Sequence, residues 1–369
     1  MPLQLGLVGL PNVGKSTLFN ALTQAGAAVA SYPFTTISPN VGVMPVPDPR
    51  LGRVVEILSR QRPPERVVPA TLRVVDIAGL VRGASKGEGL GNQFLAHIRD
   101  VDAVAMVVRC FRDEDIPHVT TELDPRDDIE TVELELILAD LDVLERRLER
   151  VRTQAKGRAH EVEPELAALE AVKAGLQSGV PVRRMELTEE QRGYLGEVAL
   201  LTIKPILYVA NVSESELPDG GDLAQAVAER AAQEGAPCVV LAAPLEAELA
   251  TWTDAEADAY LSEVGLSMAS LGRFIRTGYV LLDYITFFTT TGGHEVRAWT
   301  LRRGRTALDA AATVHSDMAR GFIRAEVVSF EDLDAAGSLA RARELGHLRL
   351  EGRDYVVQDG DVIHIRFNV

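Results

Sequence analysis

The sequence predicts an α/β protein with a doubly wound parallel sheet, a long helical insertion within it, and a smaller, mostly β domain after it. Two observations carry this prediction. Short apolar runs typical of buried strands alternate with helical patterns, and a phosphate-binding motif follows the first run. The runs cover residues 4–9, 72–79, 103–109, 205–211 and 238–243. A chain of 369 residues is long enough for two or three domains.

The composition is that of a globular protein, with 46% hydrophobic and 25% charged residues. The sequence contains no run of about 18 apolar residues, the length that a helix needs to span a bilayer. The net charge of −16 argues against a generally basic nucleic-acid binder but leaves room for local basic patches. Cys110 and Cys238 lie in or beside apolar runs, which favours buried thiols over a disulfide framework. We therefore expect a cytoplasmic protein without membrane contact.

The segment GLPNVGKS, Gly9 to Ser16, fits the phosphate-loop pattern G-x-x-x-x-G-K-[ST] between a predicted strand and a predicted helix. Gly14 permits close backbone approach, Lys15 should reach the β- and γ-phosphates, and Ser16 should ligate Mg²⁺. The competing interpretation, an ordinary strand–helix turn, leaves the lysine without a partner. The predicted nucleotide-binding residues of this segment are Asn12, Val13, Gly14, Lys15, Ser16 and Thr17.

A second phosphate-side element follows the next predicted strand, where VVDIAG supplies Asp76 and Gly79. The carboxylate can hold Mg²⁺ through water, and the glycine N–H can sense the γ-phosphate. The polar loop 32–40 contains Thr35 and Thr36, one of which should close on Mg²⁺. Spacing does not choose between the two threonines, and either could simply cap a turn.

Leu80 occupies the position where many GTPases place a glutamine that orients the attacking water. Either a partner completes the site or another residue positions the water. His118 is the nearest titratable candidate, and its alternative is a surface loop histidine. The expected catalytic residues are Lys15, Gly79 and His118.

The base-reading segment is Asn211, Val212, Ser213 and Glu214, where guanine readers carry Asn-Lys-x-Asp. Adenine lacks the N1–H and 2-amino donors, so a carboxylate held there would face a lone pair, and the longer Glu214 would have to swing away. Val212 removes the lysine stem that often packs on the base. Asn211 can still bond N7 and a 6-amino group. The site is permissive or adenine-preferring, unless Glu214 still reaches guanine.

The gap between the third and fourth strands carries two apolar seams at steps of three and four residues, which predict an antiparallel helical hairpin. The first helix should end near Gly157 and the second should begin near Pro164. The basic stretch 145–158 is either a solvated helix end or a nucleic-acid contact. The predicted seam residues are Leu134, Ile137, Leu141, Leu144, Leu148 and Val151, then Val162, Leu166, Leu169, Val172 and Leu176.

From Tyr284 the pattern becomes rich in aromatic and β-branched residues, and a hairpin is predicted around Gly292-Gly293. A helix is expected near 306–319, and strands are expected in IRAEVVSF and at the end of the chain. These features predict a small, mostly β domain wrapped on one helix.

Together, GLPNVGKSTLFNALT, the glycine-rich stretch from Gly83 to Gly91, ANVSE and DGDVIHIRFNV resemble the Obg-related, YchF-type ATPases of the translation-factor class of P-loop proteins. The resemblance spans essentially the whole chain. It implies a nucleotide domain over 1–125 and 202–284, a coiled-coil insertion over 126–201 and a C-terminal, β-grasp-like TGS domain over 285–369.

The resemblance also implies site residues and partners. Thr36 matches the switch threonine, His118 a position suspected in catalysis, and Asn12 a residue that helps to hold a monovalent cation, so K⁺ is expected beside Mg²⁺. Implied partners are ATP and the ribosome with its RNA, through the large subunit or the 70S particle. The docking arms would be the coiled coil and the TGS domain, with basic residues such as Arg146, Arg147 and Arg150 between them. A monomer is expected.

Three functional hypotheses follow. The first is an Mg²⁺-dependent ATPase that binds the ribosome and regulates translation or stress signalling. The second is a GTPase of the same fold, and the third is a nucleotide-gated ribosome or RNA adaptor whose hydrolysis is incidental.

Overall fold

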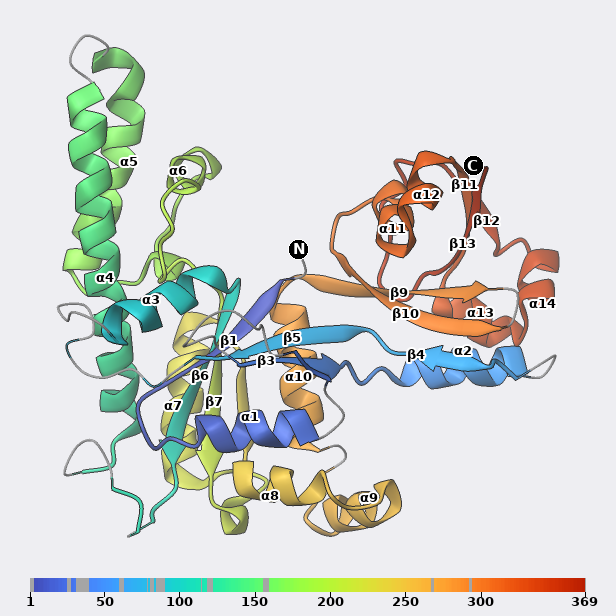
Figure 1. Cartoon of the computed structure of the whole chain (residues 1–369), viewed down its shortest axis with the longest axis horizontal. Helices are drawn as coiled ribbons and strands as arrows, with labels where there is room; N and C mark the ends of the chain where they lie inside the picture. Colours follow the sequence, from blue (N-terminus) through green and yellow to red (C-terminus); the bar gives the residue numbers. More distant parts are fainter. Residues whose placement is uncertain are drawn as a thin grey trace. The chain divides into compact units, whose positions relative to one another are not determined.

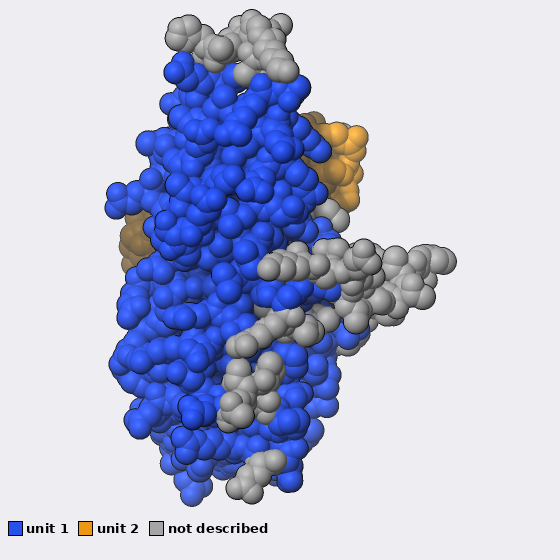
Figure 2. All heavy atoms as spheres, turned by 90° about the vertical axis from the view of Figure 1, so that its left-hand side faces the viewer, with its two compact units in different colours: residues 1–43, 73–274 blue, residues 44–72, 275–369 orange. Residues whose placement is uncertain are grey.

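The computed structural model of the chain describes residues 3–24, 28–30, 40–59, 63–77, 79, 83, 90–113, 115–117, 122–154, 159–266, 269–291 and 294–368. The chain divides into two compact units, one formed by Met1–Val43 and Arg73–Phe274, the other by Met44–Leu72 and Ile275–Val369. Figure 2 shows the two units in separate colours. The second unit therefore takes in residues 44–72 as well as the C-terminal segment, a partition that the sequence pattern does not indicate.

A seven-stranded sheet forms the first unit, in the order β2-β3-β5-β1-β6-β7-β8. The pairs β1–β5, β1–β6, β6–β7 and β7–β8 are all parallel. Every residue of β6 and β7 is buried, as expected for central strands covered on both faces. The five predicted strands are confirmed. The strands are β1 Gln4–Val8, β2 Ala28–Ala30, β3 Asn40–Pro45, β5 Thr71–Asp76, β6 Ala103–Cys110, β7 Ile206–Val212 and β8 Cys238–Leu241.

Helices flank this sheet (Figure 1). α1 contacts α8, and α7 packs against β7. α7 ends at Gly235, whose φ of 64° provides the left-handed cap that glycine adopts without steric cost. Outside the helical insertion, the helices of this unit are α1 Lys15–Gln24, α3 Leu90–Asp100, α7 Gly221–Glu234, α8 Ala243–Leu249 and α9 Asp254–Glu263, with the 3₁₀ turn η2 at Glu214–Glu216. α10, Ser270–Leu281, begins in this unit and continues into the second. Within the described ranges, no helix is both long enough and apolar enough to cross a membrane.

The insertion between β6 and β7 is the predicted helical hairpin, with α4 (Pro125–Gln154) and α5 (Ala159–Gln177) side by side in Figure 1. Its seam buries residues of both helices from Ile137 to Val151 and from Leu169 to Leu176. Two details of the prediction are wrong. α5 begins at Ala159 and includes Pro164, and Leu134 is 54% exposed.

The exposure of Leu134 has a packing cause. Toward its N-terminal end, α4 contacts α7, where Arg126 pairs with Glu229 and Glu133 with Arg230. A different stripe, which includes Ile129, Val132 and Leu136, is buried there. The seam of the hairpin therefore starts only at Ile137, and Leu134 faces solvent.

The chain returns from the hairpin through η1 (Val182–Arg184) and α6 (Glu189–Leu195), and a buried carboxylate fixes this return. Asp140 is fully buried on α4 and accepts hydrogen bonds from the N–H groups of Leu201 and Thr202 and from the Thr202 hydroxyl. Burial raises the pKa of Asp140, while these donors oppose the shift. The hairpin is thereby fastened just before β7.

The second unit has a six-stranded sheet in the order β12-β11-β13-β9-β10-β4. The predicted hairpin is confirmed by the antiparallel pairing of β9 and β10, while β13 joins β9 in parallel. Its core gathers Phe287, Ala310, Val327 and Ile363 among others. The strands are β4 Arg66–Val68, β9 Tyr284–Thr291, β10 Glu295–Arg302, β11 Phe322–Val328, β12 Arg349–Glu351 and β13 Val362–Phe367.

The prediction of a single helix in this unit is wrong. The expected helix breaks at His315, which ends α11 and caps α12. Further short helices follow, and residues 44–72 contribute another helix. This segment is attached by Arg50, whose guanidinium pairs with Asp48 and with Asp359. The helices are α2 Pro49–Ser59, α11 Ala307–Val314, α12 Ser316–Arg320, α13 Phe330–Ala336 and α14 Leu339–Glu344.

Candidate functional site

The loop between β1 and α1 requires glycine at two positions. Gly9 has a φ of 150°, and a Cβ atom there would lie 2.4 Å from the carbonyl oxygen of Val107. Gly14 has a φ of 93°, and its Cβ would lie 2.2 Å from Nδ2 of Asn211. Asn12, between them, also has a positive φ of 63°. The loop thus runs against β6 and β7 in a conformation that other residues would obstruct.

Lys15 lies at the start of α1 with its side chain only 7% exposed. Its Nζ donates to the carbonyl oxygens of Gly9 and Leu10, each at 3.2 Å. Burial lowers the pKa of Lys15 to about 8, although the nearby charge of Asp76 opposes the shift. A buried ammonium that donates to two neutral carbonyl oxygens is ready to pair with an anion such as a phosphate.

Asp76, the last residue of β5, and Gly79, which follows it, both lie near the Lys15 ammonium. Burial raises the pKa of Asp76, and Lys15 opposes that shift. A Cβ added to Gly79 would lie 3.2 Å from the Lys15 Nζ. The structure therefore brings these predicted residues together, with the ammonium between the phosphate loop and the segment that follows β5.

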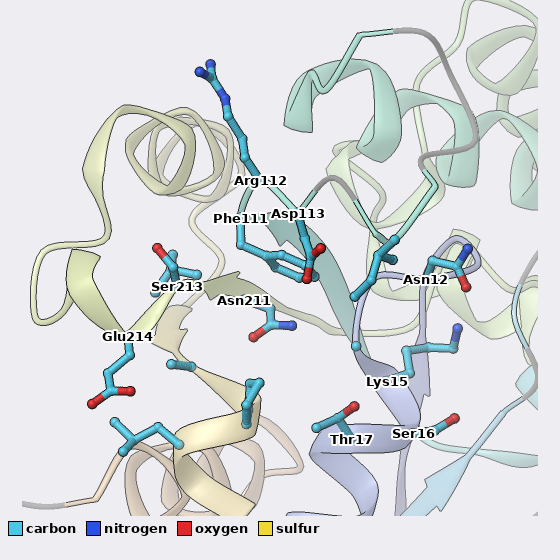
Figure 3. A pocket seen from close by; sticks show the side chains of 16 residues that line it. Asn12, Lys15, Ser16, Thr17, Phe111, Arg112, Asp113, Asn211, Ser213 and Glu214 are labelled. Carbon is cyan, nitrogen blue, oxygen red and sulfur yellow. The ribbon is translucent and has the colours of Figure 1, made fainter.

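Beside this loop lies a cavity of about 600 Å³ that opens along the carboxyl ends of β6 and β7 (Figure 3). A cavity of this size accommodates a nucleotide-sized ligand. Figure 3 places Lys15 and Glu214 on opposite sides of the cavity, with Asn211 between them. The lining residues are Asn12, Gly14, Lys15, Ser16, Thr17, Phe111, Arg112, Asp113, Ile116, Asn211, Val212, Ser213, Glu214, Ala242, Pro244 and Leu245.

Asn211 is 1% exposed at the end of β7, and its amide joins two loops. Nδ2 donates to the carbonyl oxygen of Val13 at 2.9 Å, and Oδ1 accepts from the N–H of Ala243 at 3.0 Å. One N–H and one lone pair of this amide remain beyond these two bonds. Asn211 therefore fixes the base-side wall to the phosphate loop while keeping hydrogen-bonding capacity for a base.

Glu214 begins η2 directly after the base-reading strand, and its carboxylate accepts a hydrogen bond from the Tyr260 hydroxyl on α9. This bond raises the pKa of Tyr260 to about 12. The Glu214 carboxylate therefore has a specific side-chain partner on α9.

The wall formed by the loop after β6 was not predicted from the sequence. Phe111 presents an aromatic ring at the cavity, and Arg112, Asp113 and Ile116 also line it. The carboxyl ends of neighbouring parallel strands form ligand sites, and the loop after β6 is such an end beside β1. That rule could have identified the segment.

A buried arginine organises this loop. Arg109 is 3% exposed, and its guanidinium donates to the carbonyl oxygens of Phe111 at 3.2 Å, Asp113 at 3.2 Å and Ile116 at 3.0 Å. It also lies over the Phe111 ring, 4.6 Å from the centroid. The Arg109 guanidinium, which has five N–H donors, thus fixes the backbone of this cavity wall.

Two family models match the chain. One, for the C-terminal region of YchF GTPases and described as a protein of unknown function (DUF933), matches residues 284–368, and one described as a 50S ribosome-binding GTPase matches residues 4–140. A protein of Bacillus subtilis strain 168, named ribosome-binding ATPase YchF, is 51% identical over 371 residues that cover 100% of both chains. The chain belongs to the YchF family.

Two further relatives support the assignment to the YchF family. The ribosome-binding ATPase YchF of Haemophilus influenzae is 50% identical over 369 residues, again 100% of both chains. The solved structure of the Schizosaccharomyces pombe YchF GTPase matches with a TM-score of 0.87 at 34% identity, covering 99% of this chain and 97% of that one. The predicted YchF resemblance and P-loop fold are confirmed. The names of these relatives differ on the nucleotide: the bacterial YchF proteins are named ATPases and the fungal one a GTPase.

Several predicted YchF site residues lie outside the described residues: Thr35, Thr36, Leu80 and His118. The described residue Pro117 precedes His118, and its carbonyl oxygen accepts a hydrogen bond from Asn12 Nδ2 at 3.1 Å. Gly83, the first residue of the glycine-rich stretch, donates its N–H to Glu135 on α4 at 2.6 Å. The first bond ties the residue before His118 to the phosphate loop, and the second ties the start of the glycine-rich stretch to the hairpin.

The donor set of this YchF chain fits a magnesium ion. Mg²⁺ prefers oxygen ligands and takes only one or two from a protein when a nucleotide supplies phosphate oxygens. The Ser16 hydroxyl lines the cavity, and the Asp76 carboxylate lies close enough to Lys15 for their charges to interact. A hydroxyl oxygen and a carboxylate oxygen are therefore both available near the phosphate loop.

Proposed function

We propose that the chain is an Mg²⁺-dependent ATPase that binds the ribosome and regulates translation or a stress response. One observation carries the nucleotide assignment: the acidic residue of the base-reading segment is hydrogen-bonded through one oxygen to Tyr260, which orients its carboxylate toward α9. The names of the bacterial relatives support both the ATPase and the ribosome parts of the proposal.

On the phosphate side, we assign binding to Gly9–Ser16 and Thr17. A phosphate group would replace the carbonyl oxygens as the partner of the Lys15 ammonium, since an anion binds a buried cation more strongly than a neutral acceptor does. Ser16, Thr36 and Asp76 would hold Mg²⁺, and Asn12 would help to hold K⁺. Mg²⁺ would neutralise negative charge on the phosphate oxygens.

The Gly79 N–H would sense the γ-phosphate, since its backbone lies next to Lys15. His118 would position the attacking water in place of the glutamine that Leu80 replaces. The bond from Asn12 to Pro117 supports this assignment, because it holds the residue before His118 against the phosphate loop.

On the base side, Asn211 would bond the adenine edge, with Val212 and Phe111 as its apolar neighbours in the cavity wall. The neighbouring segment offers Ala242 and Ala243, without a polar side chain, and the Ala243 N–H is already bonded to Asn211. Recognition on this side therefore depends on the Asn211 amide and on contacts with apolar side chains.

Ribosome binding would use the helical hairpin over 126–201 and the C-terminal TGS domain over 285–369, with the large subunit or the 70S particle as partner. The predicted basic tip is partly neutralised within the hairpin, because Arg146 pairs with Asp142, Arg147 with Glu165, and Arg152 with Glu170. Arginines that are paired in this way contribute less to a phosphate contact. A cytoplasmic location and a monomeric state accompany this proposal.

A turnover assay tests the proposal. Phosphate release from ATP and from GTP is measured with Mg²⁺, with and without added ribosomes, and ribosome binding is followed by pelleting. The proposal expects ATP to be the better substrate and the protein to pellet with ribosomes. Preferred GTP turnover would favour the GTPase alternative, which the name of the fungal relative supports. Binding to ribosomes without turnover would favour the adaptor hypothesis.

A further inference from the structure

At the base side of the cavity, the carboxylate of Glu214 is engaged by a residue that no nucleotide-binding motif includes. Tyr260 on α9 donates its hydroxyl hydrogen to Oε1 of Glu214 across 46 residues of sequence. Within the described parts of the chain, no cation forms an ion pair with Glu214. The orientation of this carboxylate therefore depends on a neutral donor.

The Tyr260 ring is held in place by its own neighbours. It packs edge-on against Trp252, with centroids 5.5 Å apart and an interplanar angle of 85°. Both rings cover an apolar cluster formed by Ala242, Leu245, Leu249, Leu261 and Leu266. Ala242 and Leu245 of this cluster also line the nucleotide cavity. The hydroxyl group is thus presented by packed helices that adjoin the base-side wall.

We propose that Tyr260 is a specificity-positioning residue, whose hydroxyl holds the Glu214 carboxylate away from the place from which it would accept the N1–H and 2-amino hydrogens of guanine. This inference rests on the proposed preference for ATP and gives it a cause in the structure. With its pKa raised to about 12 by the bond to Glu214, Tyr260 remains a protonated donor at neutral pH.

The Glu214 carboxylate can accept hydrogen bonds either from Tyr260 or from guanine. Oε1 of Glu214 accepts the Tyr260 hydroxyl, while Oε2 keeps its lone pairs. To accept the N1–H and the 2-amino hydrogen of guanine side by side, the carboxylate must turn both oxygens to the base, so the gain from these donors is reduced by the bond to Tyr260 that is then lost. Adenine offers no donors there, so its binding leaves the bond intact. Tyr260 therefore penalises guanine without contacting any nucleotide.

The test measures ADP and GDP affinities by calorimetry with Mg²⁺ for the full-length wild type, Tyr260→Phe, Glu214→Ala and the double variant. Tyr260→Phe keeps the ring and removes one oxygen. We expect it to raise GDP affinity about fivefold, the effect of one net hydrogen bond, and to leave ADP affinity unchanged. In the double variant, which lacks the carboxylate, the gain in GDP affinity should disappear.

Tyr194→Phe is the matched control. Tyr194 also donates its hydroxyl to a glutamate, Glu190, at 3.1 Å, but on α6 of the insertion. Its loss should leave both affinities unchanged, and thermal unfolding of both variants checks that the fold is retained.

An unchanged ratio of ADP to GDP affinity in Tyr260→Phe would overturn the inference, as would a GDP gain that persists without the Glu214 carboxylate. In either case, a wild type that prefers ADP would leave the proposed function standing. A wild type that prefers GDP would contradict the proposed function and this inference together.

Discussion

The side-chain amide of Asn211 donates to the carbonyl oxygen of Val13 over 2.9 Å and so fastens the base-reading strand to the phosphate loop. The same amide accepts the N–H of Ala243, at the start of α8. One buried side chain thereby fixes the distance between the groups that face the base and those that face the phosphates. Nucleotide affinity and local stability should depend on it together.

Asn211→Ala should weaken ATP binding and lower the free energy of unfolding by about 2–4 kcal/mol, because a buried carbonyl and a buried N–H both lose their partner. Thermal and urea unfolding and calorimetry measure the two effects. Asn20→Ala on the exposed face of α1 is the control and should change neither. A variant at Asn211 as stable as the control would show that the two bonds contribute nothing.

Gly14→Ala should abolish nucleotide binding, because its Cβ would meet the Asn211 amide at 2.2 Å. Gly304→Ala is the matched control: its φ is 80°, against 93° for Gly14, but no atom lies within 4 Å of its Cβ position. Both variants should lose about 1–2 kcal/mol of stability to left-handed strain. Only Gly14→Ala should lose affinity in a titration, and equal affinities would refute the steric argument.

The empty protein should gain stability as pH rises from about 8 to 10.5, and Lys15 is the cause. Its folded-state pKa is lowered from 10.5 to about 8, so the unfolded chain binds the extra proton in this window. The stabilising contribution is present above 10.5 and is lost as pH falls through 8.

Lys15→Met removes the buried charge and should abolish this gain, which urea unfolding at several pH values measures. At pH 7 the variant should be more stable than the wild type by about 1–3 kcal/mol when empty. It should bind no ATP, since the phosphate loses its ammonium partner. Parallel pH curves for the two proteins would show that Lys15 is not the titrating group.

Arg109→Lys should loosen the cavity wall, because a lysine cannot reproduce the fork that spans the Phe111, Asp113 and Ile116 carbonyl oxygens. We expect a loss of about 1–3 kcal/mol of stability and faster amide hydrogen exchange in residues 111–113 and 115–116. Arg324→Lys, at an exposed position on β11, is the control. Unchanged exchange in the loop would contradict the role assigned to Arg109.

Much of the fold and the phosphate side could be predicted from local sequence. Buried parallel strands such as β6 are apolar at every position, so they stand out as runs, and the phosphate loop is a fixed spacing of residues beside one of them. The structure then brings Lys15 of this loop together with Asp76 and Gly79, which follow the neighbouring strand β5.

The remaining features depend on contacts between distant segments. Tyr260 lies on a helix whose sequence gives no sign of its partner Glu214, and the Arg109 side chain is buried at the end of an apolar strand although it carries a charge. Residues 44–72 join the second unit because β4 pairs with β10. Neither local periodicity nor composition encodes such pairings.

Calorimetric titration of the purified protein with ATP and, separately, with GTP, under one Mg²⁺ concentration and at neutral pH, tests the proposed nucleotide preference most directly. We expect ATP to bind more tightly, because the Tyr260 hydroxyl holds one oxygen of Glu214 and orients the carboxylate toward α9. Markedly tighter binding of GTP would contradict that preference.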